Sequence, residues 1–252
     1  MKHGSSSPVP AGRLGQAARI AASGVGLAAL GYAAWTAVAW YRYGRASKAE
    51  GAAADPLLDH FMPEFDVVER HHIAVDAPQE LTMAAAREQR LDRSPVIRAI
   101  IKTRMMVMGG KETETAAKEL LPQMLALGWG VLAETPGEIV VGAVTRPWEA
   151  NVTFTALPPD EFEAFNDPGY VKIVWSLRAD PVMPDGSIFR TETRARATDA
   201  FARAKFRRYW ALSSAGIALI RVLSLAPLKA DAERRWRTTS KAPMSPETTL
   251  ST

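Results

Sequence analysis

The sequence of 252 residues contains no cysteine, which excludes disulfide bonds and thiolate chemistry. The absence does not distinguish the cytoplasm from the periplasm. Histidine is scarce too, with four in the chain, and no HExxH motif occurs. The adjacent His71 and His72 lie on a predicted strand, where neighbours point to opposite faces, so they cannot readily chelate one ion. The sequence therefore predicts no metal site and no cofactor.

Motifs for nucleophilic catalysis and phosphate binding are missing as well. No GxSxG nucleophile elbow is present, and the paired Gly109 and Gly110 lack Walker spacing. Gly24, Gly26 and Gly31 lie inside an uncharged run instead of a phosphate loop. A net charge of +4 says little about nucleic acid, and no nucleic-acid partner is predicted.

Groups for acid–base chemistry are scattered. Glu134, Glu138 and Glu192 are available in principle. Glu192 is more typical of a strand residue that pairs with Arg190, Arg194 or a cross-strand partner on the solvent face. The sequence assigns no catalytic residue and favours a protein without catalysis.

Charge is absent from residues 20–41, between Arg19 and Arg42. A helix needs about 20 mostly apolar residues to cross the hydrocarbon core of a bilayer. Aromatic residues such as Trp40 gather at one end, where amphipathic rings prefer the headgroup level. The run therefore predicts a single transmembrane helix over residues 19–42, with the membrane contacted through residues 20–41.

Two alternatives to a membrane anchor stay open. One is a cleavable signal peptide with a small-residue site at residues 37–39, although the apolar part of such peptides spans about 7–15 residues. The other is a buried core helix, which would have to be wrapped on all sides because it has no polar face. Orientation is not predicted, since basic residues flank the run almost equally on both sides.

The remaining chain divides by composition. Residues 1–18 read as a polar tail and residues 43–55 as an Ala-rich spacer. Residues 56–236 are long enough for one domain with its own core. Residues 237–252, rich in Ser, Thr and Pro, are predicted to be disordered.

Within the domain, the pattern predicts helices and an antiparallel meander, followed by a long helix. Asp199 is a natural N-cap for that helix, and Pro227 is expected to kink or end it. The uncharged run 209–220 is too short for a second span. The expected elements are strands at 67–75, 129–134, 138–144, 152–157, 170–178 and 187–198, and helices at 79–90, 96–106 and 112–127.

Three segments resemble the START-like (SRPBCC) superfamily, which includes polyketide cyclase-like and lipid-transfer proteins. They are LLDHFMPEFDVVERHHIAVDAPQELTMAAAREQRLDRSPVIRAIIKTR, GVLAETPGEIVVGAVTRPW and TETRARATDAFARAKFRRYWALSSAGIALIR. The resemblance extends over nearly all of residues 57–235. It implies an α+β helix-grip fold, in which a curved antiparallel sheet wraps a long C-terminal helix. It also implies a cavity between them for apolar ligands such as lipids, quinones or polyketides.

On this resemblance, the sequence predicts a binding or carrier domain for a hydrophobic small molecule, held at a membrane that we expect to be the bacterial inner membrane. The alternatives are a cyclase or dehydratase that uses the same cavity, and an interaction module without ligand. The basic residues at 203–208 are expected to form a solvated face, or to attract acidic headgroups. Oligomeric state stays open. The cavity candidates are His71, Trp129, Phe154, Trp175, Trp210, Ser213 and Ile217.

Overall fold

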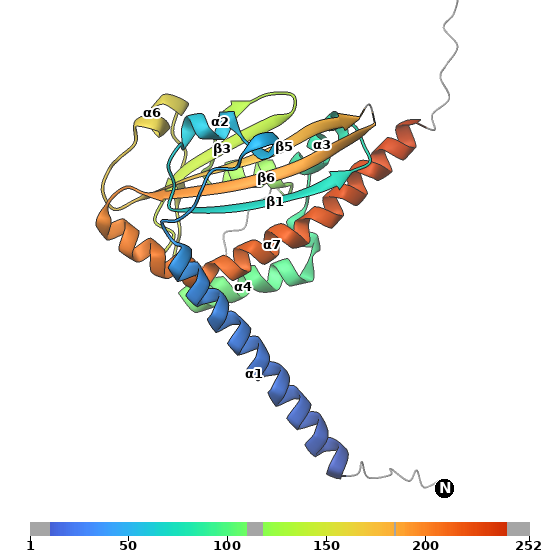
Figure 1. Cartoon of the computed structure of the whole chain (residues 1–252), viewed down its shortest axis with the longest axis vertical. Helices are drawn as coiled ribbons and strands as arrows, with labels where there is room; N and C mark the ends of the chain where they lie inside the picture. The colour runs from blue at the N-terminus through green and yellow to red at the C-terminus, as the bar shows by residue number, and fades with distance from the viewer. Residues whose placement is uncertain (1–10, 110–117, 184, 241–252) are drawn as a thin grey trace, which may run out of the picture.

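The computed structural model describes residues 11–109, 118–183 and 185–240. A long helix, α1 (Ala11–Arg42), projects from a domain in which an antiparallel sheet curves over a second long helix, α7 (Ala200–Ser240) (Figure 1). This arrangement confirms the predicted α+β helix-grip fold.

The sheet has the strand order β1-β6-β5-β3-β2, with β4 paired to β3. All strand pairs are antiparallel, and β5 with β6 forms the longest hairpin. The strands predicted at 67–75 and 187–198 are confirmed to within one residue. The strand predicted at 152–157 has only two residues in the structure. The strands are β1 (Val67–Val75), β2 (Gly130–Glu134), β3 (Glu138–Thr145), β4 (Phe154–Thr155), β5 (Val171–Met183) and β6 (Gly186–Ala197).

Short helices surround the sheet. The helices predicted at 79–90 and 96–106 are confirmed with shifted ends, while the one expected at 112–127 begins only at Leu120, and its residues 112–117 lie outside the described residues. The elements are η1 (Gly51–Ala53), α2 (Pro56–Phe61), α3 (Gln79–Arg87), η2 (Leu91–Arg93), α4 (Pro95–Met108), α5 (Leu120–Ala126) and α6 (Pro159–Ala164).

Alternating side chains give the sheet an apolar layer on each face. The inner face packs against α3 and α7 through residues such as Val141, Leu177 and Phe189. The outer face packs against α2 and α6 through residues such as Val140 and Val174. Among the described residues, the domain therefore has an apolar core on each side of the sheet, and a third cluster around Phe206 and Trp210 packs against Tyr43 and Val67.

The stretch predicted as a spacer, residues 43–55, packs against α7 at Tyr43 and reaches the outer face of the sheet at residues 52–55. Asp55 caps α2 by accepting from the amide of Leu58 at 2.8 Å, and it also accepts from the Ser176 hydroxyl at 3.0 Å. Arg178 of β5 donates to the carbonyl of Ala54 at 2.7 Å. These bonds hold the segment against β5, so it is part of the domain instead of a loose connection.

Helix α7 begins as predicted, because the amide of Ala202 donates to the Asp199 carboxylate at 2.7 Å. Pro227 was expected to kink or end the helix; it does not end it, since the helix continues to Ser240, and the kink stays a prediction. Proline costs one backbone hydrogen bond there. Leu228 and Ala232, both buried on the far side of the proline, keep the next turns packed on the sheet and α3.

Among the described residues, α7 is the one helix that is long and apolar enough to cross a membrane by composition. Its Phe206, Trp210 and Ala218 are buried, so it serves as the central helix of the domain. The predicted span 19–42 lies within α1 and remains a prediction.

Replacing Gly128 by alanine is expected to destabilise the domain by more than about 2 kcal/mol. Gly128 has a φ of +97°, and an added Cβ would overlap the carbonyl oxygen of Phe154. Gly169 is the matched control, because its φ is +85° but the space around it is open. Gly169→Ala should cost about 1–2 kcal/mol, the strain of the left-handed backbone alone. Urea unfolding of both variants measures the difference, and equal losses would contradict the predicted clash.

Candidate ligand site

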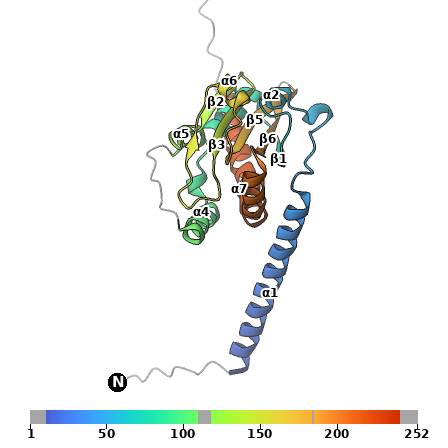
Figure 2. The ribbon, with the colours of Figure 1, turned by 90° about the vertical axis from the view of Figure 1, so that its left-hand side faces the viewer.

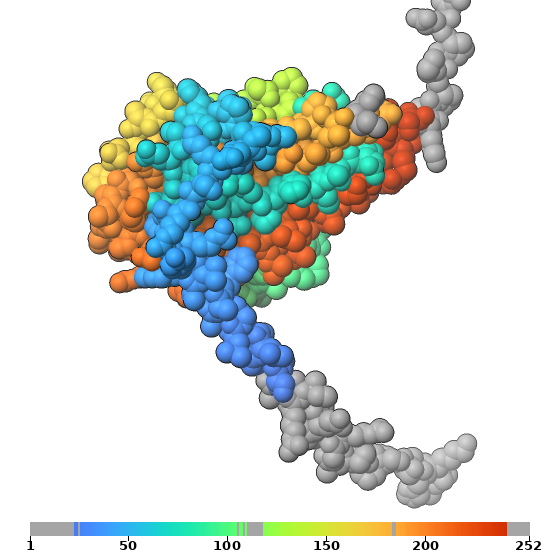
Figure 3. Space-filling view, viewed as in Figure 1, coloured from blue at the N-terminus to red at the C-terminus, as the bar shows by residue number. Residues whose placement is uncertain are grey.

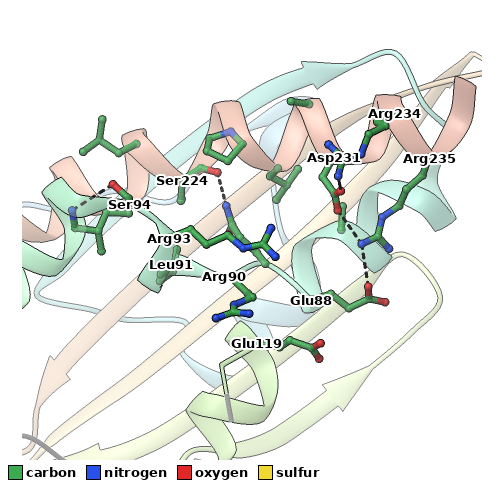
Figure 4. A pocket seen from close by; sticks show the side chains of 17 residues that line it. Glu88, Arg90, Leu91, Arg93, Ser94, Glu119, Ser224, Asp231, Arg234 and Arg235 are labelled. Atoms are coloured by element: carbon green, nitrogen blue, oxygen red, sulfur yellow. Dashed lines mark hydrogen bonds and ion pairs between the residues drawn. The ribbon is translucent and has the colours of Figure 1, made fainter. Parts of the chain in front are cut away.

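A cleft of about 670 Å³ opens between α7 and the segment that joins α3 to α4 (Figure 4). Its apolar wall includes Leu91, Ile97, Leu223 and Leu228. Its rim carries charges, with Arg235 bound to Glu88 at 2.9 Å and to Asp231 at 2.7 Å. The cleft therefore offers apolar surface below a charged rim.

The charged residues that line the cleft carry slightly more positive than negative charge. Four arginines stand against three carboxylates, which leaves one net positive charge. The arginines come from η2 and the C-terminal part of α7 (Figure 4). The charged lining residues are Arg90, Arg93, Arg234, Arg235, Glu88, Glu119 and Asp231.

Behind the cleft lies a narrow space of about 10 Å³ between the sheet and α7. This volume suffices for about one water molecule. Gln89, Leu91 and Ser224 line both the cleft and this inner space. The Gln89 side-chain amide donates to the carbonyl of Ser224 at 2.5 Å, so this bond lies at the neck between them. A ligand that reached the interior would have to displace it.

Arg221 of α7 is the charged residue of the inner space. Its guanidinium carbon lies 3.4 Å from the centroid of the Trp175 ring, and it donates to the Thr193 hydroxyl at 3.2 Å. The Trp175 indole donates in turn to Thr191 on the same strand as Thr193. Sheet and helix thus hold the guanidinium in one orientation.

The charge of Arg221 lacks a carboxylate in direct contact. Burial lowers the pKa of Arg221 to about 9, and the negative charge of Glu69 opposes this shift. The group is therefore still protonated at neutral pH. No carboxylate among the described residues lies within ion-pair distance of it. Because a partly desolvated cation without a counter-charge is unfavourable, this half-buried position favours an anion.

Of the predicted cavity residues, Trp175 lies in the inner space. Trp210 packs with Phe206 of the inner core and borders a separate hollow under α1. Trp129 and Phe154 pack against each other, with ring centroids 5.2 Å apart, at the β2–β4 side of the sheet. The structure therefore does not bring these aromatic residues together in one pocket.

The remaining predicted site residues lie elsewhere on the inner side of the sheet. His71 is close to Glu69, with 3.4 Å between its Nε2 and a carboxylate oxygen. Ser213 donates to the carbonyl of Tyr209 one turn earlier in α7. Ile217 packs against the core that contains Val67 and Trp210. None of the three lines the cleft or the inner space, and among the described residues no three metal-ligating side chains gather.

Sequence reasoning missed Arg221, Gln89 and Ser224. A signal for Arg221 was available, because positions 210, 217 and 221 differ by seven and four residues and share one face of a helix. Arg221 therefore lies on the apolar stripe of α7. A charge at such a position is a candidate for a functional role.

A second buried polar cluster lies on the outer face, under the segment that leads into α2. Glu138 of β3 is buried, and one of its carboxylate oxygens has no hydrogen-bond partner among the described residues. Burial, together with a hydrogen bond to Asp55 and the negative charge of Asp55, raises the pKa of Glu138 to about 8. Protonated Glu138 therefore helps to hold Asp55 and the segment around it on the sheet.

We expect this cluster to make stability fall as pH rises. The pKa of Glu138 is about 8 in the folded chain against 4.5 for an unperturbed glutamate, so folding favours the protonated form. Its contribution is complete below about pH 4.5 and is lost as pH rises through about 8. Glu138→Gln should remove this part of the pH dependence. Urea midpoints of both proteins from about pH 5 to about pH 9 test this, and parallel profiles would contradict it.

No protein-family profile matches this chain, and no curated protein matches it in sequence. Among solved structures, it is similar to a conserved protein from Geobacillus kaustophilus, with 11% identity and a TM-score of 0.30, over 69% of this chain and 97% of that chain. It is also similar to the Zhui aromatase/cyclase from a Streptomyces species, with 16% identity and a TM-score of 0.28, over 69% and 97% of the two chains.

A third similar structure is CalU16 from Micromonospora echinospora, with 11% identity and a TM-score of 0.22, over 68% of this chain and 97% of that chain. The structural neighbours thus include an aromatase/cyclase. Scores and identities of this size assign no activity to the chain, and membership of the START-like superfamily stays a resemblance.

Proposed function

We propose that this protein is a membrane-anchored domain that binds a hydrophobic small molecule carrying an acidic group. The observation that carries the proposal is Arg221, a protonated side chain in the inner space that no carboxylate of the described residues contacts. A ligand carboxylate or phosphate would supply that counter-charge through charge-assisted hydrogen bonds once the Gln89–Ser224 bond opens, because the inner space as it stands holds about one water molecule. The Trp175 face and the Thr193 hydroxyl already hold the guanidinium in place for it.

The apolar part of the ligand would lie in the cleft. Leu91, Leu223 and Leu228 supply apolar wall there, and burial of ligand surface against them is favourable by about 25 cal/mol per Å². Gln89 and Ser224 line both the cleft and the inner space. The hydrogen bond between them separates a ligand in the cleft from Arg221. Binding would exchange that bond for contacts to the ligand.

The uncharged run 20–41 supports the membrane part of the proposal. A hydrophobic ligand is concentrated in the bilayer, so an anchor at the start of the chain would keep the cleft near its source. Helix α1 extends away from the domain as a continuous helix that contains this run (Figure 1).

A binding role is favoured over a cyclase or dehydratase role by the lining of the inner space. An enzyme of that type needs an acid or base beside its substrate. Among the described residues, Arg221 is the titratable group that lines the space, and His71 and the carboxylates lie outside it. Turnover of a polyketide-like substrate by the purified protein would instead favour the cyclase or dehydratase function.

The test compares two ligands that differ in charge alone. The full chain in lipid nanodiscs is titrated with a radiolabelled long-chain fatty acid and with the alcohol of the same length. The acid is expected to bind at one site, roughly tenfold or more tightly than the alcohol, because one charge-assisted bond contributes about 1.5–3 kcal/mol. Equal affinities for the acid and the alcohol would contradict the role of Arg221 in binding. If neither ligand binds saturably, the interaction module without ligand becomes the favoured function.

A further inference from the structure

The C-terminal part of α1 does not stand free of the domain but runs along α7. The Tyr32 hydroxyl donates to the carbonyl of Leu212 at 2.7 Å, and the Trp35 indole donates to the Ser214 hydroxyl at 3.0 Å. Further along, Arg207 donates to the carbonyl of Trp40 at 3.0 Å. Residues 32–40 of α1 therefore lie beside residues 207–214 of α7.

This contact overlaps the predicted membrane span. Residues 32–41 belong to the uncharged run 20–41 and cover about 14 Å of helix at 1.5 Å per residue. The hydrocarbon core is about 30 Å thick. If the run spans the bilayer, the neighbouring part of α7 must lie at the depth of one leaflet. That part of α7 matches this depth, because residues 209–220 contain no charge.

Exposed apolar side chains also occur on α7 and α4, and both α1 and α4 contact α7. Figures 1 and 2 place α4 and α7 on the side of the domain from which α1 extends. Val107, 80% exposed, and Met106, 73% exposed, lie at the end of α4, and Leu212 of α7 is 58% exposed. We name this surface the membrane face, and it consists of Ile101, Met106, Val107, Leu212, Leu219 and Val222.

The charges of the three helices favour an anionic surface. No Asp or Glu occurs in residues 11–42, 95–108 or 200–230, although the chain has 27 acidic residues. The same segments contain basic residues, among them Arg98 and Lys102 on the exposed surface of α4. Basic residues beside apolar ones are typical of helices that lie in the interface of anionic phospholipid membranes.

We infer that the membrane face is inserted into one leaflet of the bilayer, so that α4 and the outer side of α7 contact lipid beside α1. The inference rests on the proposed anchoring by α1. It adds that the cleft, which is bordered by the start of α4 and by α7, opens beside the lipid surface. An acidic amphiphile would then enter from the bilayer without crossing water. Figure 3 shows the domain at the C-terminal end of α1.

Site-directed spin labelling tests this inference in the full chain, because the natural sequence contains no cysteine to be replaced. Single cysteines are introduced by Val107→Cys on α4 and Leu212→Cys on α7, and the protein is placed in vesicles of equal parts phosphatidylcholine and phosphatidylglycerol. Glu161→Cys on α6, at an exposed site on the outer side of the sheet, is the water-exposed control. Leu27→Cys, 71% exposed on α1, reports the anchor itself.

Collisions of each label with oxygen, which dissolves in lipid, and with a water-soluble nickel complex measure its depth. The ratio of oxygen to nickel collisions should be severalfold higher at Val107 and Leu212 than at Glu161. A high ratio at Leu27 with ratios at Val107 and Leu212 equal to that of Glu161 would overturn the membrane face and leave the anchor standing. A low ratio at Leu27 as well would overturn both.

Discussion

Replacing Arg194 by leucine is expected to destabilise the domain by about 3–5 kcal/mol. Arg194 is 1% exposed and lies between β6 and the segment that contains α2. It donates to Glu192 at 2.6 Å and to the carbonyl of Met62 at 2.9 Å, and it forms an ion pair with Asp59. Its loss would leave the Met62 carbonyl without this donor, and Asp59 and Glu192 would each keep a single cation, Lys48 and Arg70.

Arg196→Leu is the matched control for that prediction. Arg196 lies two residues along the same strand and on the same face, and it pairs with Glu64 at 3.0 Å. Both side chains are largely solvent-exposed, with 46% and 75% of their surfaces accessible, so the pair should contribute no more than about 1 kcal/mol. Urea unfolding of the two variants in detergent measures the difference. Similar losses in both would mean that the outer face is not closed by α2.

Replacing Arg221 by glutamine is expected to weaken binding of an acidic amphiphile by roughly tenfold to a hundredfold, because a charge-assisted bond contributes about 1.5–3 kcal/mol. Affinity for the matching alcohol should change little, since the alcohol makes no ionic contact. The variant should fold, because Arg221 is not part of an ion pair among the described residues. The affinities of both ligands for both proteins, measured in nanodiscs, give the result.

Arg90→Gln is the control for Arg221. Arg90 lines the outer cleft, where hydrogen bonds to Asp92 raise its pKa, and its side chain is 32% exposed. Its replacement should change affinity for the acid less than twofold, because solvent screens the contact. An equal loss in the Arg90 and Arg221 variants would place the acidic group at the rim and contradict binding at Arg221.

The fold could be predicted because several local signals agreed. The alternation of β6 from Ser187 onward placed its apolar face inward, and Asp199 supplied the cap of α7. The covering of the outer face could not be predicted in this way. The sequence predicted that Glu192 pairs with a nearby arginine on the solvent face. Glu192 does pair with Arg70 and Arg194, but it is buried under α2. Alternating charges look the same in sequence whether water or a second element covers them.

The candidate site was only partly predictable. Trp175, one of the predicted cavity residues, lines the inner space, and its role in ligand binding stays a prediction. Gln89 and Ser224 come from segments far apart in the sequence, and only tertiary packing brings them to one neck. Pro227 was misread for the same reason, because the contacts that hold α7 past it belong to other elements. The spacing of apolar residues along one helix predicts which face is buried, but it does not predict which elements pack against that face.

Native mass spectrometry of the full chain, purified from its expression host and released from nanodiscs, tests ligand binding most directly. We expect a stoichiometric adduct that organic extraction identifies as an amphiphile with a carboxylate or phosphate group, and we expect Arg221→Gln to lose it while Arg90→Gln retains it. No adduct on any of the three proteins, or a neutral adduct that Arg221→Gln keeps, would contradict the proposed function.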